Sequence, residues 1–153
     1  YPTRATKFTS AMANQTVDDL HAAVSFVQER GAKQLVLIGA SLGGMATTKV
    51  AATVQPVAMI VLSAPTDLPE FDFQVTASEL AALTMPKLFI ASQDDSIVPL
   101  AATQQMFDLI AEPKELQLYT SAAHGLQLLS TDHAAALRQR LLEFVIANTA
   151  RPE

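Results

Sequence analysis

The stretch KQLVLIGASLGGMA, residues 33–46, decides the fold of this chain. Its apolar first half is typical of a strand that is buried on both faces. The run stops at Ser41, which lies among small residues in the order Gly-Ala-Ser-Leu-Gly-Gly. Residues this small at the end of a strand indicate a backbone that turns sharply and lets another group approach closely. The question is therefore whether Ser41 occupies the point of that turn.

Short apolar runs alternate with longer amphipathic segments along the whole chain. Apolar patterning predicts strands over residues 34–39, 57–63, 87–92 and 115–119. The first three runs are nearly continuous in Val, Ile, Leu, Met and Phe, as in strands that are covered on both faces. The alternation of strands and helices predicts the α/β class, with a parallel, doubly wound sheet in a three-layer α/β/α arrangement.

The helix predictions come from the 3.6-residue spacing of apolar side chains. Helices are predicted over residues 16–30, 43–54, 99–111 and 131–148. A shorter helix is predicted to begin at Thr76 and to end before Pro86. Thr76 with Glu79 is expected to form a capping box at the start of that helix, and Thr16 with Asp19 is expected to do the same at 16–30.

Length and composition limit the class of protein. The chain has 153 residues, a net charge of −5 and no cysteine, which predicts one domain over residues 1–153. Because no stretch is rich in Lys or Arg, neither nucleic acid nor a membrane surface is expected as a partner. Without cysteine there is no disulfide or thiolate metal site. No apolar run approaches the ~20 residues of a membrane span, and no signal peptide is visible. We expect a cytoplasmic chain, with which the lack of cysteine is compatible, and a periplasmic chain is the open alternative.

With the strand before it and the helix after it, the segment around Ser41 matches the motif G-x-S-x-G. In this motif the serine lies on a strained strand-to-helix turn with its hydroxyl exposed. Glycines on both sides are expected to be necessary because a Cβ would clash, and the N–H after the serine helps to bind an oxyanion. The alternative interpretation is a tight turn in which Ser41 only caps the helix.

A serine nucleophile needs a base, and the base needs a carboxylate that orients it. His21 and His133 fall in helix patterns and are expected to be surface or packing residues. His124 instead follows the last predicted strand. Because the carboxyl ends of parallel strands share one edge of the sheet, His124 is expected on the same edge as Ser41.

Three aspartates are candidates for the orienting acid. Asp94 and Asp95 follow the strand at 87–92, and Asp67 follows the strand at 57–63. All three are therefore expected at the carboxyl edge of the sheet. Asp94 has a second interpretation, because an aspartate just ahead of a helix is also typical of an N-cap.

The chain resembles the C-terminal part of an α/β-hydrolase serine esterase. Three segments carry the resemblance: LVLIGASLGG, KLFIASQDDSIVP and SAAHGLQLL. In this family the second segment has an aspartate, two residues and then Val-Pro, which selects Asp95 over Asp94. The resemblance implies that Ser41 is the nucleophile and that His124 is the general base and then the general acid. It also implies that Asp95 orients the histidine and that the backbone N–H of Leu42 is an oxyanion donor.

The reaction implied by this resemblance is hydrolysis of a small carboxylic ester through an acyl-enzyme, with no metal or organic cofactor. The connection over residues 64–86 is too short for a large cap domain, so we expect an open site. The segment TDLPEFDF, residues 66–73, is expected to line the acyl or alcohol pocket.

The chain departs from the family in one respect. The family usually has several strands ahead of the nucleophile strand, and residues 1–4 look like the loop after the last of these, so we expect a fold that lacks the usual N-terminal strands. The strand at 34–39 is then an edge without charged residues. We therefore expect a homo-oligomer, or association with a missing N-terminal segment, and a second oxyanion N–H from outside these residues.

Two hypotheses from other classes stay open beside a complete esterase. One is a non-catalytic α/β-hydrolase-like domain that binds a ligand at the same edge of the sheet. The other is half of a hydrolase, which needs a second segment or a swapped dimer for activity. Covalent labelling by a fluorophosphonate distinguishes the binding domain from an esterase.

Overall fold

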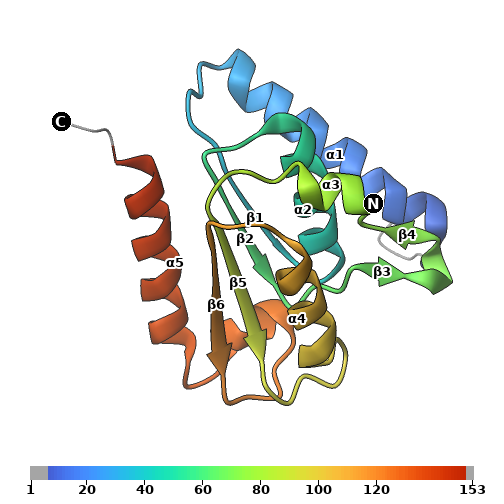
Figure 1. Cartoon of the computed structure of the whole chain (residues 1–153), viewed down its shortest axis with the longest axis vertical. Helices are drawn as coiled ribbons and strands as arrows, with labels where there is room; N and C mark the ends of the chain where they lie inside the picture. Colours follow the sequence, from blue (N-terminus) through green and yellow to red (C-terminus); the bar gives the residue numbers. More distant parts are fainter. Residues whose placement is uncertain (1–6, 151–153) are drawn as a thin grey trace.

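A parallel sheet forms the centre of the molecule (Figure 1). The computed structural model describes residues 7–150. The sheet has the strand order β1 (Val36–Ala40), β2 (Ala58–Leu62), β5 (Lys87–Ser92) and β6 (Lys114–Tyr119), and all neighbours are parallel. The strands therefore lie in sequence order, with β1 at one edge as predicted. The interpretation of residues 1–4 as a loop falls outside the described residues.

Helices cover the two faces of the sheet unequally (Figure 1). They are α1 (Ser10–Glu29), α2 (Leu42–Val54), α3 (Ala77–Ala81), α4 (Leu100–Leu109) and α5 (Ala134–Thr149). On β2, Met59 and Val61 pack in the core with α1 to α4, whereas Ile60 and Leu62 pack in the core with α5. This is the predicted three-layer α/β/α fold. No helix within residues 7–150 has the length and apolar character that crossing a membrane requires.

The first helix begins earlier than the sequence predicts. α1 starts at Ser10 because Thr9 caps it, accepting a hydrogen bond from the Met12 N–H at 3.3 Å. Thr16 lies inside the helix, where its hydroxyl donates to the Ala13 carbonyl at 2.6 Å. The capping box predicted at residue 16 is therefore wrong, since that threonine is bonded backwards into the helix and not forwards across a helix start.

The segment between β6 and α5 also differs from its prediction. A 3₁₀ helix, η2 (Gly125–Ser130), lies where the sequence predicts no helix, and α5 begins at Ala134 instead of residue 131. η2 is held in place because Leu128 is buried in the same core as α5. The loop between β6 and η2 is thus anchored to this core at both ends, by Tyr119 before it and by Leu128 after it.

A small insertion after β2 lies beside the main sheet (Figure 1). It consists of β3 (Asp67–Leu68), the 3₁₀ helix η1 (Pro69–Phe71) and β4 (Phe73–Gln74), and the two short strands pair antiparallel. Two-residue strands carry too little pattern to be predicted from sequence.

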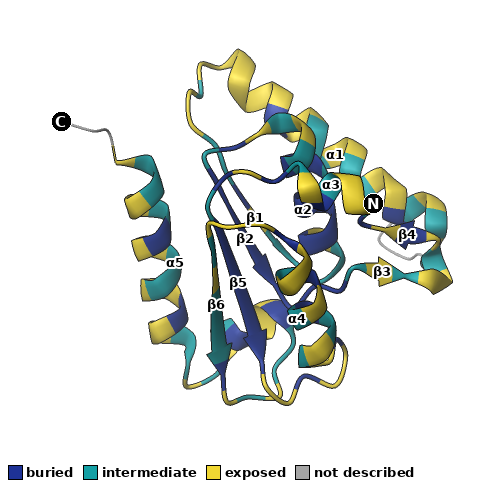
Figure 2. Cartoon of the chain, in the orientation of Figure 1, coloured by how far each residue is buried: buried dark blue, intermediate teal, exposed yellow. Residues whose placement is uncertain are grey.

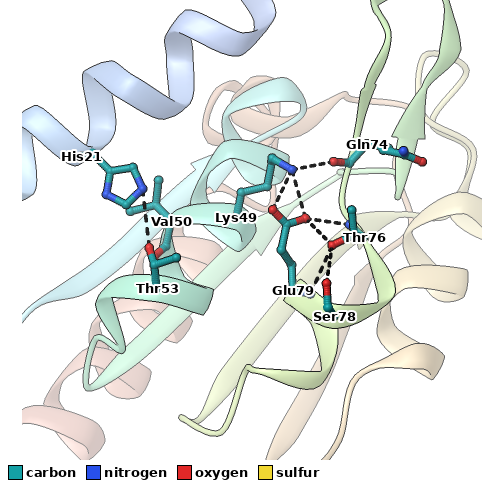
Figure 3. A network of polar contacts seen from close by, with 8 residues as sticks. All are labelled: His21, Lys49, Val50, Thr53, Gln74, Thr76, Ser78 and Glu79. Atoms are coloured by element: carbon teal, nitrogen blue, oxygen red, sulfur yellow. Dashed lines mark hydrogen bonds and ion pairs between the residues drawn. The ribbon is translucent and has the colours of Figure 1, made fainter.

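A charged network ties this insertion to α2 (Figure 3). Lys49 Nζ donates to both carboxylate oxygens of Glu79, at 2.7 and 3.0 Å, and to the Gln74 carbonyl at 2.8 Å. Glu79 also accepts hydrogen bonds from the Thr76 N–H and hydroxyl, and its own N–H donates to Thr76 Oγ1, which confirms the predicted capping box. Burial raises the pKa of Glu79, but these hydrogen bonds outweigh it and hold the pKa below its usual value.

The two edges of the sheet differ in composition. β6 carries Lys114, Glu115 and Gln117, and such polar side chains protect an edge strand from unwanted pairing. β1 carries no charged residue, and the Ile38 side chain on it is 50% exposed. The inner strands β2 and β5 are buried along their whole length (Figure 2). β1 thus has the composition of an inner strand at an edge position.

Backbone groups of β1 also face away from the sheet. The Ser41 N–H donates to the Leu62 carbonyl of β2, and N–H and C=O groups alternate sides along a parallel strand. The N–H and C=O groups of Val36, Ile38 and Ala40 therefore point to the outer edge of the sheet. No strand within residues 7–150 pairs with these groups. A groove of about 330 Å³ lies along this edge, beside α1 and α2.

We predict that this edge makes the chain self-associate through β1 of a second copy. The outward groups are symmetric about Ile38, so two copies can pair antiparallel with each N–H facing a C=O. Ile38→Lys should increase the monomeric fraction measured by light scattering, because a charge protects the edge. The control Leu142→Lys changes a side chain on α5 that is also exposed, to 60%, and should have no such effect. A native chain that stays monomeric at all concentrations would contradict the prediction.

The charged network predicts a pH-dependent stability. Glu79→Gln should lower the free energy of unfolding at pH 7 by about 1–2 kcal/mol, because it removes a partly buried charged hydrogen bond. Since folding lowers the pKa of Glu79, this contribution is complete above the unfolded pKa and is lost as pH falls through the folded pKa. Urea unfolding between pH 7 and about pH 3 measures the deficit. Glu143→Gln, exposed on α5, is the control. An equal deficit at both ends of the pH range would argue against the charge as the cause.

Candidate active site

Ser41 lies at the point of the turn between β1 and α2. Its backbone has φ 54° and ψ −127°, a combination that residues other than glycine rarely adopt. Its N–H remains in the sheet, donating to the Leu62 carbonyl at 2.8 Å. Its carbonyl accepts hydrogen bonds from the N–H groups of Gly44 and Met45 in the first turn of α2. One residue therefore joins strand and helix directly, at the cost of local backbone strain.

Close packing requires glycine at only one of the two motif positions beside the serine. A Cβ on Gly39 would lie 2.1 Å from the Gly43 carbonyl oxygen, so α2 can approach β1 only if residue 39 is glycine. Among the described residues, a Cβ on Gly43 would meet no heavy atom within 4 Å outside its own helix backbone, which corrects the prediction that both glycines are necessary. Gly44 is the second tight position, since a Cβ there would lie 2.8 Å from Ala64 Cβ. Gly43 differs because it lines the groove along the outer edge of β1.

Asp95 and His124 form a hydrogen-bonded pair at the carboxyl edge of the sheet. The distance from His124 Nδ1 to Asp95 Oδ2 is 2.8 Å. The other carboxylate oxygen accepts hydrogen bonds from the N–H groups of Ile97 and Val98, at 2.9 and 3.0 Å. Burial raises the pKa of Asp95, but the hydrogen bonds from Val98, His124 and Ile97 outweigh it and hold the pKa below its usual value. A charged carboxylate here favours the histidine tautomer with its proton on Nδ1, which leaves Nε2 as an acceptor.

The alternative acids and bases lie in other surroundings. Asp94 and Asp67 are exposed, Asp94 just after β5 and Asp67 in β3. His21, on α1, faces a threonine hydroxyl of α2 at 3.5 Å (Figure 3). His133 faces a backbone carbonyl at the end of β6 at 3.0 Å. Within residues 7–150, Asp95 is the acid that bonds to the His124 ring.

The histidine loop packs against the nucleophile turn without a direct hydrogen bond between the two side chains. Gly125 has φ 50°, and a Cβ on it would lie 3.3 Å from Ala40 Cβ. Gly125, which follows His124, therefore packs against Ala40, which precedes Ser41. Among the described residues, Ser41 Oγ forms no hydrogen bond. Catalytic hydrogen bonds are often long without substrate and tighten when it binds.

A mainly apolar cleft of about 370 Å³ opens beside the serine. Its lining consists of Phe8, Ser41, Leu42, Leu68, Glu70, Phe71, Ile97 and Val98. Leu68 and Phe71 come from the insertion, so the segment at residues 66–73 does reach the serine, and its role in an acyl or alcohol pocket stays a prediction. Phe8 was not predicted, because nothing in the sequence near it indicates that its ring meets Phe71 edge to face, with centroids 5.0 Å apart. Leu42 is the first residue of α2, where backbone N–H groups have no intrahelical acceptor.

Comparison with protein families gives a match over most of the chain. The family model described as "Serine hydrolase" matches residues 3–136. A search of curated protein sequences finds no match.

Solved structures with the same fold are longer than this chain. The esterase domain of a Rhodothermus marinus protein is 25% identical with a TM-score of 0.68, over 85% of this chain and 67% of that one. An alpha-beta serine hydrolase homologue from Coxiella burnetii is 24% identical with a TM-score of 0.64, over 88% and 58%. Est1E from Butyrivibrio proteoclasticus is 15% identical with a TM-score of 0.74, over 94% and 72%. The last two likenesses concern the fold alone, and the chain spans less than two thirds of the Coxiella protein.

Proposed function

The chain belongs to the serine hydrolase family, and from this premise we propose that it cleaves small carboxylic esters with a triad of Ser41, His124 and Asp95. The observation that carries the proposal is the 2.8 Å hydrogen bond between Asp95 and His124, at the edge of the sheet where Ser41 ends β1. A carboxylate bonded to Nδ1 in this way orients a histidine as the base for a serine nucleophile. The similarity to an esterase domain supports the choice of ester over other acyl compounds.

In the proposed reaction, Ser41 Oγ attacks the ester carbonyl carbon while His124 Nε2 takes the hydroxyl proton. Asp95 holds the Nδ1 proton and stabilises the imidazolium that forms. The tetrahedral oxyanion accepts a hydrogen bond from the Leu42 N–H, at a helix N-terminus where the dipole favours negative charge. His124 then gives its proton to the leaving alkoxide oxygen, which leaves an acyl-enzyme. Water, deprotonated by His124, attacks this acyl group. The bond to Ser41 Oγ then breaks, His124 returns the proton to that oxygen, and the carboxylic acid is released.

The cleft beside the serine supports a small, neutral and mainly apolar acyl or alcohol group. Its volume of about 370 Å³ is near the lower end for small-molecule sites. Phe71 and Leu68 offer apolar walls to such a group. Glu70 is the charged residue of the lining, and its carboxylate disfavours anionic substrates.

A second candidate is that these residues form one part of a hydrolase that another segment or a swapped dimer completes. Two features beside the turn at Ser41 favour it: within residues 7–150, a Cβ on Gly43 would face open space and no strand pairs with the outer edge of β1. The added segment would then supply a second oxyanion N–H, and its absence would lower the rate by roughly 10²–10³-fold. Location in the cytoplasm stays a prediction from the sequence.

Ser41→Ala tests the nucleophile. A fluorophosphonate should label the native chain, and p-nitrophenyl butyrate should be hydrolysed. The variant should lose labelling, and turnover should fall by about 10⁴-fold, because no nucleophile remains. Ser25→Ala, exposed on α1, is the matched control and should keep both activities. Activity that survives Ser41→Ala would refute the assignment, and a native chain without labelling would favour the non-catalytic binding domain. Labelling with very slow turnover would favour the incomplete hydrolase.

The paired substitutions Asp95→Asn and Asp94→Asn test the acid. Asp95→Asn removes the charge that holds the His124 tautomer, so kcat for the same ester should fall by roughly 10⁴-fold. Asp94→Asn, one residue away and exposed, should change kcat little. Circular dichroism of both variants checks that the fold is intact. A larger loss of kcat in Asp94→Asn than in Asp95→Asn would assign the role to Asp94. If both variants kept the native kcat, Asp67 would become the candidate.

A further inference from the structure

Two fully buried serines lie at the ends of neighbouring strands, next to the histidine loop. Ser63 directly follows β2 and Ser92 is the last residue of β5, and both are 0% exposed. A hydroxyl in such surroundings is stable only if it is hydrogen-bonded, because burial removes its water. The partners of these two hydroxyls therefore indicate what they do.

Both hydroxyls bond to the backbone on either side of His124. Ser63 Oγ accepts a hydrogen bond from the Gly125 N–H at 3.2 Å. Ser92 Oγ donates a hydrogen bond to the Ala123 carbonyl. The peptide groups before and after His124 are thus each held by a serine at the carboxyl end of a strand of the central sheet.

Ser63 occupies this position in spite of backbone strain. Its φ is 47°, in the left-handed region where glycine or asparagine is usual. Glycine would remove the strain but would leave the buried Gly125 N–H without this partner. The hydroxyl is thus the feature of Ser63 that glycine cannot replace.

The contacts within the triad do not fix the distance between His124 Nε2 and Ser41 Oγ, and the two serine hydrogen bonds can set this distance. Asp95 fixes the Nδ1 side of the His124 ring, yet Ser41 Oγ forms no hydrogen bond among the described residues. The separation of Nε2 from Ser41 Oγ therefore depends on where the backbone of the histidine loop lies. Displacing a catalytic group by about 1 Å is enough to cost roughly 10²-fold in rate.

We propose that Ser63 and Ser92 are positioning residues that hold His124 within reach of Ser41 by fixing the backbone on both sides of the histidine. The inference rests on the proposed ester hydrolysis, but it assigns to two further residues a role that the triad does not include. Neither serine touches the substrate or the reacting atoms.

The test compares Ser63→Gly, Ser63→Ala and Ser92→Ala with Ser92→Thr and with the control Ser25→Ala. Ser63→Gly removes hydroxyl and strain together, whereas Ser63→Ala removes only the hydroxyl. Both should lower kcat for p-nitrophenyl butyrate by roughly 10–100-fold with little change in KM. Ser92→Ala should do the same, and Ser92→Thr, which retains a hydroxyl, should recover most of the loss. Thermal unfolding should show all variants folded at the assay temperature.

A second readout separates positioning from a general loss of structure. The downfield proton NMR signal of a His124 Nδ1–H bonded to Asp95 should persist in Ser63→Gly, although fluorophosphonate labelling of Ser41 becomes slower. Native kcat in Ser63→Gly and Ser92→Ala would overturn the inference, and so would a loss of activity that only follows the unfolded fraction. Loss of the NMR signal would show that the serines act on the acid pair, and would also overturn it. Failure of the native chain to react with ester or fluorophosphonate would instead refute the proposed function itself.

Discussion

The close approach of α2 to β1 at Gly39 is the contact on which the rest of the site depends. The Gly43 carbonyl oxygen and the Thr47 hydroxyl lie where a Cβ on residue 39 would be, at 2.1 and 2.4 Å. Only this packing lets the helix begin immediately after Ser41, whose φ of 54° makes the connection in one residue. A side chain at position 39 would push α2 away from the sheet and would move the Leu42 N–H with it. The proposed nucleophile and the proposed oxyanion donor are thus placed by one contact.

The parallel ladder brings the other groups to the same point. Because neighbouring strands are in parallel register, the strands end along one edge, and the polar residues of the site follow those ends. The buried strands are mainly apolar, since a polar side chain inside the sheet loses its water and needs a partner in exchange. Lys87, at the start of β5, is fully buried and has such partners, because its ammonium group donates to the Leu83 and Met85 carbonyls. At the edge Asp95 finds such partners in two backbone N–H groups and in His124, which is why it stays charged although it is nearly buried.

The same arrangement leaves β1 without a neighbouring strand on one side within residues 7–150. β1 has the apolar composition of an inner strand. Close packing would explain a glycine at position 43, but among the described residues a Cβ there would face open space. The groove along β1 is lined by both Gly39 and Gly43, so an element that covers this edge would also border the first turn of α2. An element that paired with β1 would therefore lie next to the oxyanion donor that we propose at Leu42.

Features that depend on residues close together in the chain could be predicted from the sequence. The apolar runs predicted the strands, G-x-S-x-G predicted the turn at Ser41, and Thr76 with Glu79 predicted a capping box, because each pattern acts within about one turn or one strand. The same local rule was wrong at Thr16, where two capping sites compete and only the surrounding packing selects between them. Residue spacing alone did not separate Asp95 from Asp94, and it gave no reason to single out the serines at positions 63 and 92. Tertiary structure decided those points, because a bond such as Ser63 to Gly125 joins residues 62 positions apart, and only the folded sheet brings them together.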